Sequence, residues 1–321
     1  APHLVKPLPF LIPIYKDKGV PRWKLGLGLW LYDLLSTGKK IGRHQFLSRK
    51  EVLAMEPNIN SQNLTGGALY FDAQMDDARL CLESILQAKE LGSDCFNHVE
   101  VTDIVLNPDQ PVQLSTRNCI TGDVQTIKAK IVINATGPWT DSIINKIFPS
   151  KPMLKSSKGT HIIVPKLTNN HALLLHTDQD NRVFFVIPWG QHSLVGTTET
   201  TPSQAPDMVY PSKADITYLL SELRQAFPQF ALKKADIINA FSGLRPLLKQ
   251  GIDTSLTSTS REHKIIQHTP QMYSVVGGKY TTYRLIAEQT ISKLSHQLGK
   301  SFRPISDTKP LFGGELEELP I

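Results

Sequence analysis

The sequence predicts an α/β (α+β) fold in which a mostly antiparallel β-sheet domain is inserted into the remainder of an α/β domain. One observation is that residues 72–158 read as a helix and strands that end in "VINATGPW", an apolar strand followed by small residues. Another is that strand patterns dominate from Lys158 to about residue 272. A third is that a strand, two glycines and a long helical pattern follow, as expected where the α/β domain resumes.

The first α/β stretch has clear local signals. Asp76 and Asp77 can cap a helix that Gly92 ends, and Pro138 suits the first turn of a short helix over 139–147. Ligands of such sheets bind beyond the carboxyl ends of the strands, where small residues allow close approach of the backbone. We therefore expect a ligand near "NATG". The strands are expected over residues 95–101, 112–116, 124–128 and 130–134, the last of them buried.

The inserted region is predicted to be β-rich with one helix. Ser212 and Asp215 form a capping-box variant at the start of that helix, which ends near Phe227 before Pro228. A final helix is expected over 281–298, after Gly277-Gly278-Lys279. The strands are expected over residues 160–165, 172–177, 182–189, 193–199, 237–241, 264–267 and 272–276.

The N-terminal stretch is less clear. "APHLVKPLPFLIP" reads as an extended, proline-rich segment, and "RWKLGLGLWLYDLL" reads as a helix. Its glycines, Gly26 and Gly28, lack the preceding strand and the third glycine of a dinucleotide-binding loop. The favoured interpretation is a helix packed in the interior. The alternative is an amphipathic surface helix at a membrane interface, with Trp23, Trp30, Arg22 and Lys24 at that interface.

Composition narrows the function classes. A chain with 40% hydrophobic and 20% charged residues is a globular protein, which excludes disordered and fibrous classes. The formal net charge of +6 suggests an anionic partner: a phosphorylated substrate, a nucleotide cofactor, an anionic membrane surface or nucleic acid. Nucleic acid is disfavoured because no segment combines dense Lys and Arg with aromatics. Cys81, Cys95 and Cys119 lack zinc-site spacing, so we expect buried free thiols in a reducing compartment and no metal.

Several motifs, in their order and spacing, resemble the FAD-dependent (aerobic) glycerol-3-phosphate dehydrogenases, which belong to the D-amino-acid-oxidase-like flavoenzymes. The resemblance covers nearly all of residues 1–315. Members begin with a strand, a G-x-G-x-x-G loop and a helix and end in a helical cap domain, so the sequence is expected to be the middle of a longer protein. The motifs are "APHLVKPLPFLIP", "DDARL", "NATGPW", "KGTHIIVP", "VIPWG", "GTTET", "SGLRPL" and "GGKYTTYR".

The resemblance implies a split FAD-binding Rossmann-like domain with an inserted, mostly antiparallel substrate domain. Residues 1–71 and 159–272 would bind substrate, residues 72–158 and 273–301 would bind FAD, and residues 302–321 would begin a linker to the cap domain. The implied reaction is oxidation of sn-glycerol 3-phosphate to dihydroxyacetone phosphate, with hydride passing from C2 to FAD and electrons to a quinone. It also implies a cytoplasmic protein, peripheral to the membrane, with a homodimer as a candidate assembly.

Two alternatives stay open. A glycerol-3-phosphate oxidase would pass the electrons to oxygen, and a non-catalytic module would bind phosphate or a partner without turnover. The resemblance assigns His161 as the catalytic base, a role that suits an imidazole near neutral pH. It assigns Arg245 and Arg261 to the substrate phosphate, which a guanidinium binds bidentately. Without the resemblance, His161 would read as a structural histidine, Arg245 as a structural bridge and Arg261 as a solvated surface charge.

The residues expected at the cofactor lie after two strands. Small residues and glycines would allow close approach, while Lys279 and the following helix N-terminus would stabilise negative charge on the flavin. The alternative for Gly277-Gly278-Lys279 is a tight strand-to-helix turn. Asp76, Asp77 and Arg79 are assigned to capping and packing. The expected cofactor residues are Ala135, Thr136, Gly137, Trp139, Gly277, Gly278, Lys279, Thr281 and Thr282.

Overall fold

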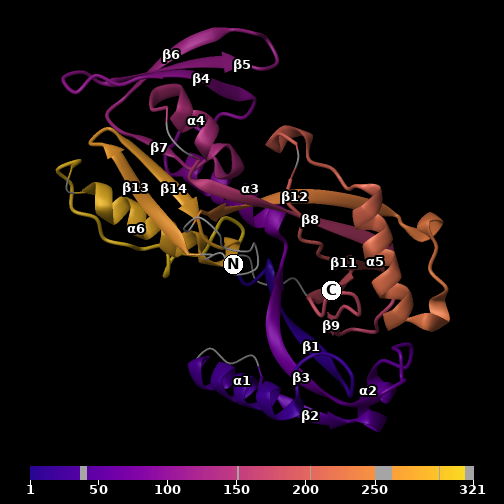
Figure 1. Cartoon of the computed structure of the whole chain (residues 1–321). Coiled ribbons are helices and arrows are strands. Elements are labelled where there is room, and N and C mark those ends of the chain that lie inside the picture. Colours follow the sequence, from indigo (N-terminus) through magenta and orange to yellow (C-terminus); the bar gives the residue numbers. More distant parts are fainter. Residues whose placement is uncertain (37–41, 150–151, 203, 250–261, 296, 315–321) are drawn as a thin grey trace. The chain divides into compact units, whose positions relative to one another are not determined.

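The structure is a computed structural model that describes residues 1–321 except 37–41, 150–151, 203, 250–261, 296 and 315–321 (Figure 1). The chain forms two compact units, each built from three segments. Unit 1 comprises residues 1–80, 158–200 and 209–243, and unit 2 comprises residues 81–157, 201–208 and 244–321. The mixed α/β architecture with several sheets confirms the predicted fold class.

Unit 1 is organised around one large sheet with strand order β12-β8-β11-β10-β9-β1-β3-β2. The pairs β1–β3, β2–β3, β9–β10, β10–β11 and β8–β11 are antiparallel, whereas β1 and β9 pair in parallel. The inserted sheet is thus mostly antiparallel, as predicted. Its strands are β1 (Val5–Tyr15), β2 (Gln45–Ser48), β3 (Leu64–Met75), β8 (Leu154–Pro165), β9 (Ala172–His176), β10 (Val183–Trp189), β11 (His192–Gly196) and β12 (Asn239–Leu248).

The core of unit 1 lies where α5 (Lys213–Ala226) packs against this sheet. Leu219 and Leu223 of α5 are fully buried in one cluster with Ile162 of β8 and Phe184 of β10. Each such side chain contributes roughly 1.5–3 kcal/mol through burial. The predicted capping box is present, because the Ser212 hydroxyl accepts from the Asp215 N–H at 3.1 Å while the Asp215 carboxylate accepts from Ser212.

Helix α1 (Arg22–Leu35) forms where predicted, but the prediction that it packs in the interior is wrong. Leu29 is its buried residue, whereas Trp23 is 73% exposed and Trp30 is 57% exposed. The apolar residues therefore recur with helical spacing on the side that faces solvent, while Leu29 faces the protein. The exposed apolar residues of this face are Trp23, Leu27, Trp30, Leu31 and Leu34, called the α1 face below.

The prediction missed strands β2 and β3 and one helix of unit 1, whereas β1 forms over the proline-rich segment that was predicted to be extended. Strand β1 pairs with β3 along its whole length although it contains Pro7, Pro9 and Pro13. Because these prolines occupy alternate positions, their missing N–H groups fall on one edge of β1 and leave the other edge intact for pairing. Helix α2 (Arg49–Met55) begins at a Ser48–Glu51 capping box that sequence reasoning overlooked.

Unit 2 contains two small sheets, with orders β4-β5-β6 and β13-β14-β7. The first is antiparallel throughout, while the second combines an antiparallel and a parallel pair. Strand β4 begins at Val99 rather than at the predicted residue 95, because His98 takes a left-handed conformation with φ +56°. The elements are α3 (Asp77–Glu90), β4 (Val99–Val105), β5 (Val112–Asn118), β6 (Val124–Ala129), β7 (Val132–Asn134), α4 (Thr140–Ile147), β13 (His263–Thr269), β14 (Met272–Gly277) and α6 (Tyr283–Ser295).

Apart from smaller differences at residues 72–80 and 201–208, the compact units differ from the predicted domain boundaries over residues 244–272. The predicted substrate domain includes these residues, whereas the contacts place them in unit 2. The reason is strand pairing, since β13 pairs with β14 and β14 pairs with β7. The assignment of one domain to substrate and the other to FAD stays a prediction.

The cysteines are free, as predicted, but the prediction that they are buried is wrong. Cys81 lies on an outward position of α3, and Cys95 and Cys119 lie just outside strands of the β4-β5-β6 sheet. Cys81 is exposed because it lies on the solvent side of the helix, and Cys95 and Cys119 are exposed because connections between elements run over the surface. Asp76 has the predicted capping role, since its carboxylate accepts from the Arg79 N–H at 3.0 Å.

Candidate functional site

Two parallel strands of unit 2 end side by side and define the candidate site. Strand β14 pairs with β7 in the register Met272–Val132, Tyr273–Ile133 and Ser274–Asn134. Their carboxyl ends therefore lie at the same edge of the sheet, where "ATG" follows β7 and "GGK" follows β14. This is the edge at which α/β sheets bind ligands. Strand β7 is less buried than predicted, because Ile133 is 39% exposed.

A pocket of about 570 Å³ opens at this edge, within unit 2. Its volume is in the range of cofactor and small-molecule sites. The side of α6 that faces it supplies residues at helical spacing, which makes one wall mainly apolar. The lining residues are Ile133, Ala135, Gly137, Pro246, Val275, Gly277, Gly278, Lys279, Tyr280, Tyr283, Ile286, Ala287, Thr290 and Ile291.

The pocket brings together five of the predicted cofactor residues: Ala135, Gly137, Gly277, Gly278 and Lys279. Those following β7 and those following β14 are far apart in sequence and meet only through the parallel pairing. Sequence reasoning missed the α6 wall. The signal was available, because Tyr283, Ile286, Ala287, Thr290 and Ile291 repeat at the spacing of one helix face.

The glycines keep the turn after β14 compact. Gly277 and Gly278 have φ of +74° and +88°, in the region that glycine adopts without strain. A Cβ at Gly277 would lie 2.5 Å from the Glu262 carbonyl oxygen, and one at Gly278 would lie 2.6 Å from Ile286 Cδ1. At Gly137, with φ +56°, a Cβ would meet no described atom within 4 Å, so this backbone borders open space.

The remaining predicted cofactor residues support the two turns and do not line the pocket. Buried Asn134 holds the first turn, since its Oδ1 accepts from the Thr136 hydroxyl at 2.6 Å and its Nδ2 donates to the Thr140 carbonyl at 3.1 Å. Trp139 Nε1 donates to Asp207 at 3.2 Å. In the second turn, the Thr282 hydroxyl donates to the Lys279 carbonyl at 2.9 Å, and Thr281 is exposed.

His161 lies in unit 1, half-buried on the central part of β8. Its ring stacks on that of Phe241, with centroids 5.4 Å apart and 17° between planes. Gly196 of β11 is its partner across the strands. Arg245 is half-buried on β12 and belongs to unit 2. Arg261 lies outside the described residues.

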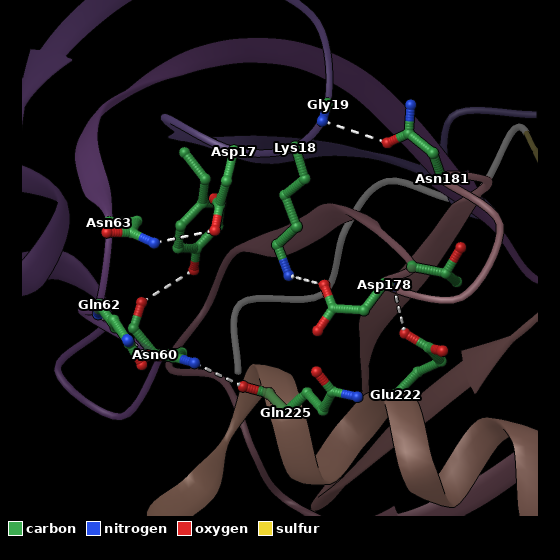
Figure 2. A network of polar contacts seen from close by, with 12 residues as sticks. Asp17, Lys18, Gly19, Asn60, Gln62, Asn63, Asp178, Asn181, Glu222 and Gln225 are labelled. Carbon is green, nitrogen blue, oxygen red and sulfur yellow. Dashed lines mark hydrogen bonds and ion pairs between the residues drawn. The ribbon is translucent and has the colours of Figure 1, made fainter.

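Unit 1 contains a second, polar cavity of about 790 Å³ between the β1–α1 loop, the loop before β3 and the loop after β9 (Figure 2). Figure 2 shows that Lys18 reaches Asp178 and that Asn63 reaches Asp17. The Asn63 Nδ2 donates to the Asp17 Oδ2 at 2.8 Å. The Asn181 Oδ1 accepts from the Gly19 N–H at 3.1 Å. These polar groups are engaged with one another, so we assign the network to holding the three loops together.

Two classes of feature are not found in the described part of the chain. The residues outside the masked ranges contain no cluster of three or more His, Cys, Asp or Glu side chains that could bind a metal. Among these same residues, no helix combines the length and the apolar character required to cross a membrane.

Comparison with known proteins finds relatives that share one name, glycerol-3-phosphate dehydrogenase. The chain is 35% identical over 301 residues to glycerol-3-phosphate dehydrogenase 2 of Mycobacterium tuberculosis, covering 91% of this chain and 49% of the relative. It is 31% identical over 326 residues to the aerobic glycerol-3-phosphate dehydrogenase of Staphylococcus haemolyticus, covering 98% of this chain and 58% of the relative. The chain thus spans about half the length of these relatives.

A solved structure with a similar fold is glycerol-3-phosphate dehydrogenase from Bacillus halodurans complexed with FAD. It aligns with a TM-score of 0.81 and 28% identity, over 98% of this chain and 56% of that chain. In addition, the family model described as FAD dependent oxidoreductase (DAO) matches residues 1–281. The match includes β7, β14 and the turns that border the pocket. The chain therefore belongs to the DAO family of FAD-dependent oxidoreductases.

Proposed function

We propose that the protein to which this chain belongs oxidises sn-glycerol 3-phosphate to dihydroxyacetone phosphate with FAD as cofactor. The observation that carries the proposal is the agreement between the glycerol-3-phosphate dehydrogenase relatives, at 31–36% identity, and the pocket at the carboxyl ends of β7 and β14. The likeness covers more than nine-tenths of the chain for these relatives. It extends through both compact units.

The pocket in unit 2 has the chemistry that a flavin requires. Ala135, Gly137 and Gly277 offer backbone without bulky side chains, and the α6 residues Ile286 and Ile291 offer an apolar wall. Lys279 supplies a positive charge at the border of the same pocket, at the start of the turn that leads into α6. We infer that these residues would hold the flavin end of FAD.

The proposed chemistry assigns one task to each polar residue. A ring nitrogen of His161 accepts the proton of the C2 hydroxyl, while Arg245 and Arg261 bind the substrate phosphate. Each charge-assisted hydrogen bond to the phosphate contributes on the order of 1.5–3 kcal/mol. FAD, when bound, accepts the hydride that leaves C2, so the loss of one proton and one hydride converts the alcohol to the ketone.

We further propose a quinone as the electron acceptor and peripheral attachment to an anionic membrane, on the cytoplasmic side. The support is the α1 face, where Trp23 and Trp30 are exposed together with three leucines. Tryptophan is favoured at membrane interfaces because its ring is apolar and its N–H is polar. Arg22 and Lys24 are exposed on the same helix and complement anionic headgroups.

The experiment is an anaerobic titration of the 321-residue chain, reconstituted with FAD, with glycerol 3-phosphate. Bleaching of a protein-bound flavin band by the substrate supports the proposal, and glycerol without the phosphate is the control for specificity. His161→Asn is expected to retain FAD but to bleach about 10²-fold or more slowly. A chain that binds FAD and is not bleached by glycerol 3-phosphate contradicts the proposal.

The same reconstituted chain separates the alternatives. Peroxide formation in air at the rate of flavin bleaching would identify an oxidase, whereas reduction of an added quinone without peroxide supports a dehydrogenase. A chain that retains no FAD at all would instead match the non-catalytic module that binds phosphate or a partner.

A further inference from the structure

We propose that Gly196 and Phe241 are positioning residues that hold the His161 imidazole in one orientation. The inference rests on the proposed role of His161 as the base, whereas the positions of the three residues are observed independently of that role. All three residues belong to unit 1 and to its large sheet, in which β8 lies between β12 and β11. His161 thus has Gly196 on one neighbouring strand and Phe241 on the other.

Gly196 provides the space into which the imidazole leans. It lies directly opposite His161 in the antiparallel β8–β11 register, so a side chain there would share the face of the sheet with the imidazole. A Cβ on Gly196 would lie 2.3 Å from His161 Cδ2, 2.8 Å from Cγ and 2.9 Å from Nε2. One edge of the ring therefore occupies the volume that any other residue at position 196 would fill.

Phe241 restrains the ring by stacking. The two planes are 17° from parallel with centroids 5.4 Å apart, a favourable offset arrangement for aromatic rings. Phe241 is 45% exposed, which is unusual for a phenylalanine that serves packing alone. Its stacking on His161 gives a local reason for its place at the surface.

Hydrogen bonds at adjacent positions make this frame rigid. Fully buried Thr160, next to His161, shares a hydrogen bond of 2.7 Å with the hydroxyl of Ser242, which follows Phe241. The Thr160 N–H also donates to the hydroxyl of Thr198, two residues after Gly196, at 3.0 Å. The three strand segments that carry His161, Phe241 and Gly196 are thereby fixed relative to one another.

The consequence is a base whose ring is oriented before substrate binds. A free histidine side chain samples several rotamers, and a proton acceptor works only in the orientation that points a nitrogen at the hydroxyl. Displacement of a catalytic group by about 1 Å can reduce the rate about 10²-fold. Removing either restraint should therefore slow proton removal while leaving the binding of substrate phosphate, which other residues perform, largely unchanged.

The test combines a spectroscopic measurement with kinetics. Histidine ring signals of the 321-residue chain are recorded by NMR, and the His161 signal is assigned by its loss in His161→Asn. Phe241→Leu should remove the ring-current shift of His161, whereas Phe241→Tyr should retain it. Gly196→Ala should move the same signals. Gly243→Ala is the matched control, because a Cβ there meets no described atom within 4 Å.

In the reconstituted enzyme, Gly196→Ala should lower kcat about 10²-fold with a small change in KM, and Phe241→Leu should lower kcat up to about 10-fold. Phe241→Tyr should restore kcat. If the His161 signals move no more in Phe241→Leu and Gly196→Ala than in Gly243→Ala, the proposal is wrong. If those signals move as expected but wild type is not reduced by glycerol 3-phosphate, the proposed function fails and the positioning stands.

Discussion

At the scale of residues, the absence of a Cβ atom at two glycines allows neighbouring groups to approach the backbone closely. Gly277 and Gly196 are each incompatible with a Cβ, but for different reasons. Gly277 combines a positive φ with a close carbonyl oxygen, whereas the atoms nearest to a Cβ on Gly196 belong to the His161 ring. The first glycine shapes the candidate flavin pocket and the second shapes the surroundings of the proposed base. Neither role is visible in the residue type itself.

Gly277→Ala is expected to destabilise the fold by about 2–5 kcal/mol, since the left-handed backbone costs about 1–2 kcal/mol and the contact with the Glu262 carbonyl adds a similar or larger cost. The matched control is Gly122→Ala, with φ +82° and no described atom within 4 Å of its Cβ. That variant should cost about 1–2 kcal/mol. Urea denaturation gives both values, and equal losses would show that the close contact at Gly277 does not matter.

At the scale of elements, the loop after β9 is tied to α5 through a buried carboxylate. Glu222 of α5 is 2% exposed, and its Oε2 accepts from the Asp178 N–H at 2.8 Å (Figure 2). Burial raises the pKa of the Glu222 carboxyl, and the charge of Asp178 raises it further, against the opposing effect of backbone hydrogen bonds. The charged form of Glu222 is therefore unfavourable in the folded state.

Because this pKa is higher in the folded than in the unfolded chain, the stability that Glu222 contributes is complete below its ordinary value of 4.5 and declines as the pH rises through the folded pKa. Glu222→Gln should retain the acceptor and avoid this loss. We expect the variant to be more stable than wild type at pH 8, on the order of 1 kcal/mol, with the difference shrinking toward pH 4. Thermal melting across this range measures it.

Glu100→Gln is the control for that experiment, because Glu100 pairs with Arg117 at 2.6 Å on the surface, where an ion pair contributes about 0–1 kcal/mol. Removing the charge of Glu100 should leave the free energy of unfolding at pH 8 unchanged or lower it slightly. A Glu222→Gln chain that is less stable than wild type at pH 8 would contradict the expectation.

At the scale of the whole molecule, net charge and the α1 face act in the same direction. In the proposed attachment, the formal charge of +6 would attract the chain to anionic lipid, and the exposed tryptophans of α1 would then enter the interfacial region. Neither feature requires a membrane-spanning helix. The combination favours attachment that is reversible and weakened by salt.

Replacing Trp23 and Trp30 together by serine should reduce binding to vesicles of phosphatidylglycerol and phosphatidylcholine at least about 10-fold, since burial of apolar area drives insertion. Vesicle cosedimentation at low and high salt measures the effect. The control replaces Ile120 and Val124 by serine; these residues are 74% and 69% exposed around the β5–β6 turn. Equal losses in both double variants would contradict a specific role of the α1 face.

Much of the local structure could be predicted from the sequence because its causes are short-range. The Ser212–Asp215 capping box, the Gly92 helix end and the strand before "NATG" all depend on residues within a few positions. The family motifs likewise identified five of the fourteen residues that line the pocket. The motifs together were specific for the family because each of them requires small, basic or glycine residues at fixed positions.

The tertiary structure decided whatever depends on distant partners. The apolar stripe of α1 indicates a buried face as readily as an exposed one, and only packing through Leu29 leaves Trp23 outside. Gly66 and Gly67 lie within β3, where the Leu47 carbonyl and the Val52 side chain occupy the space that a Cβ at these positions would need. The sequence by itself determined the family and most of the elements, but not β2, β3 or α2. Pairing across long separations determined which strands meet at the pocket and which side chains surround His161, since burial and register are properties of the assembled chain.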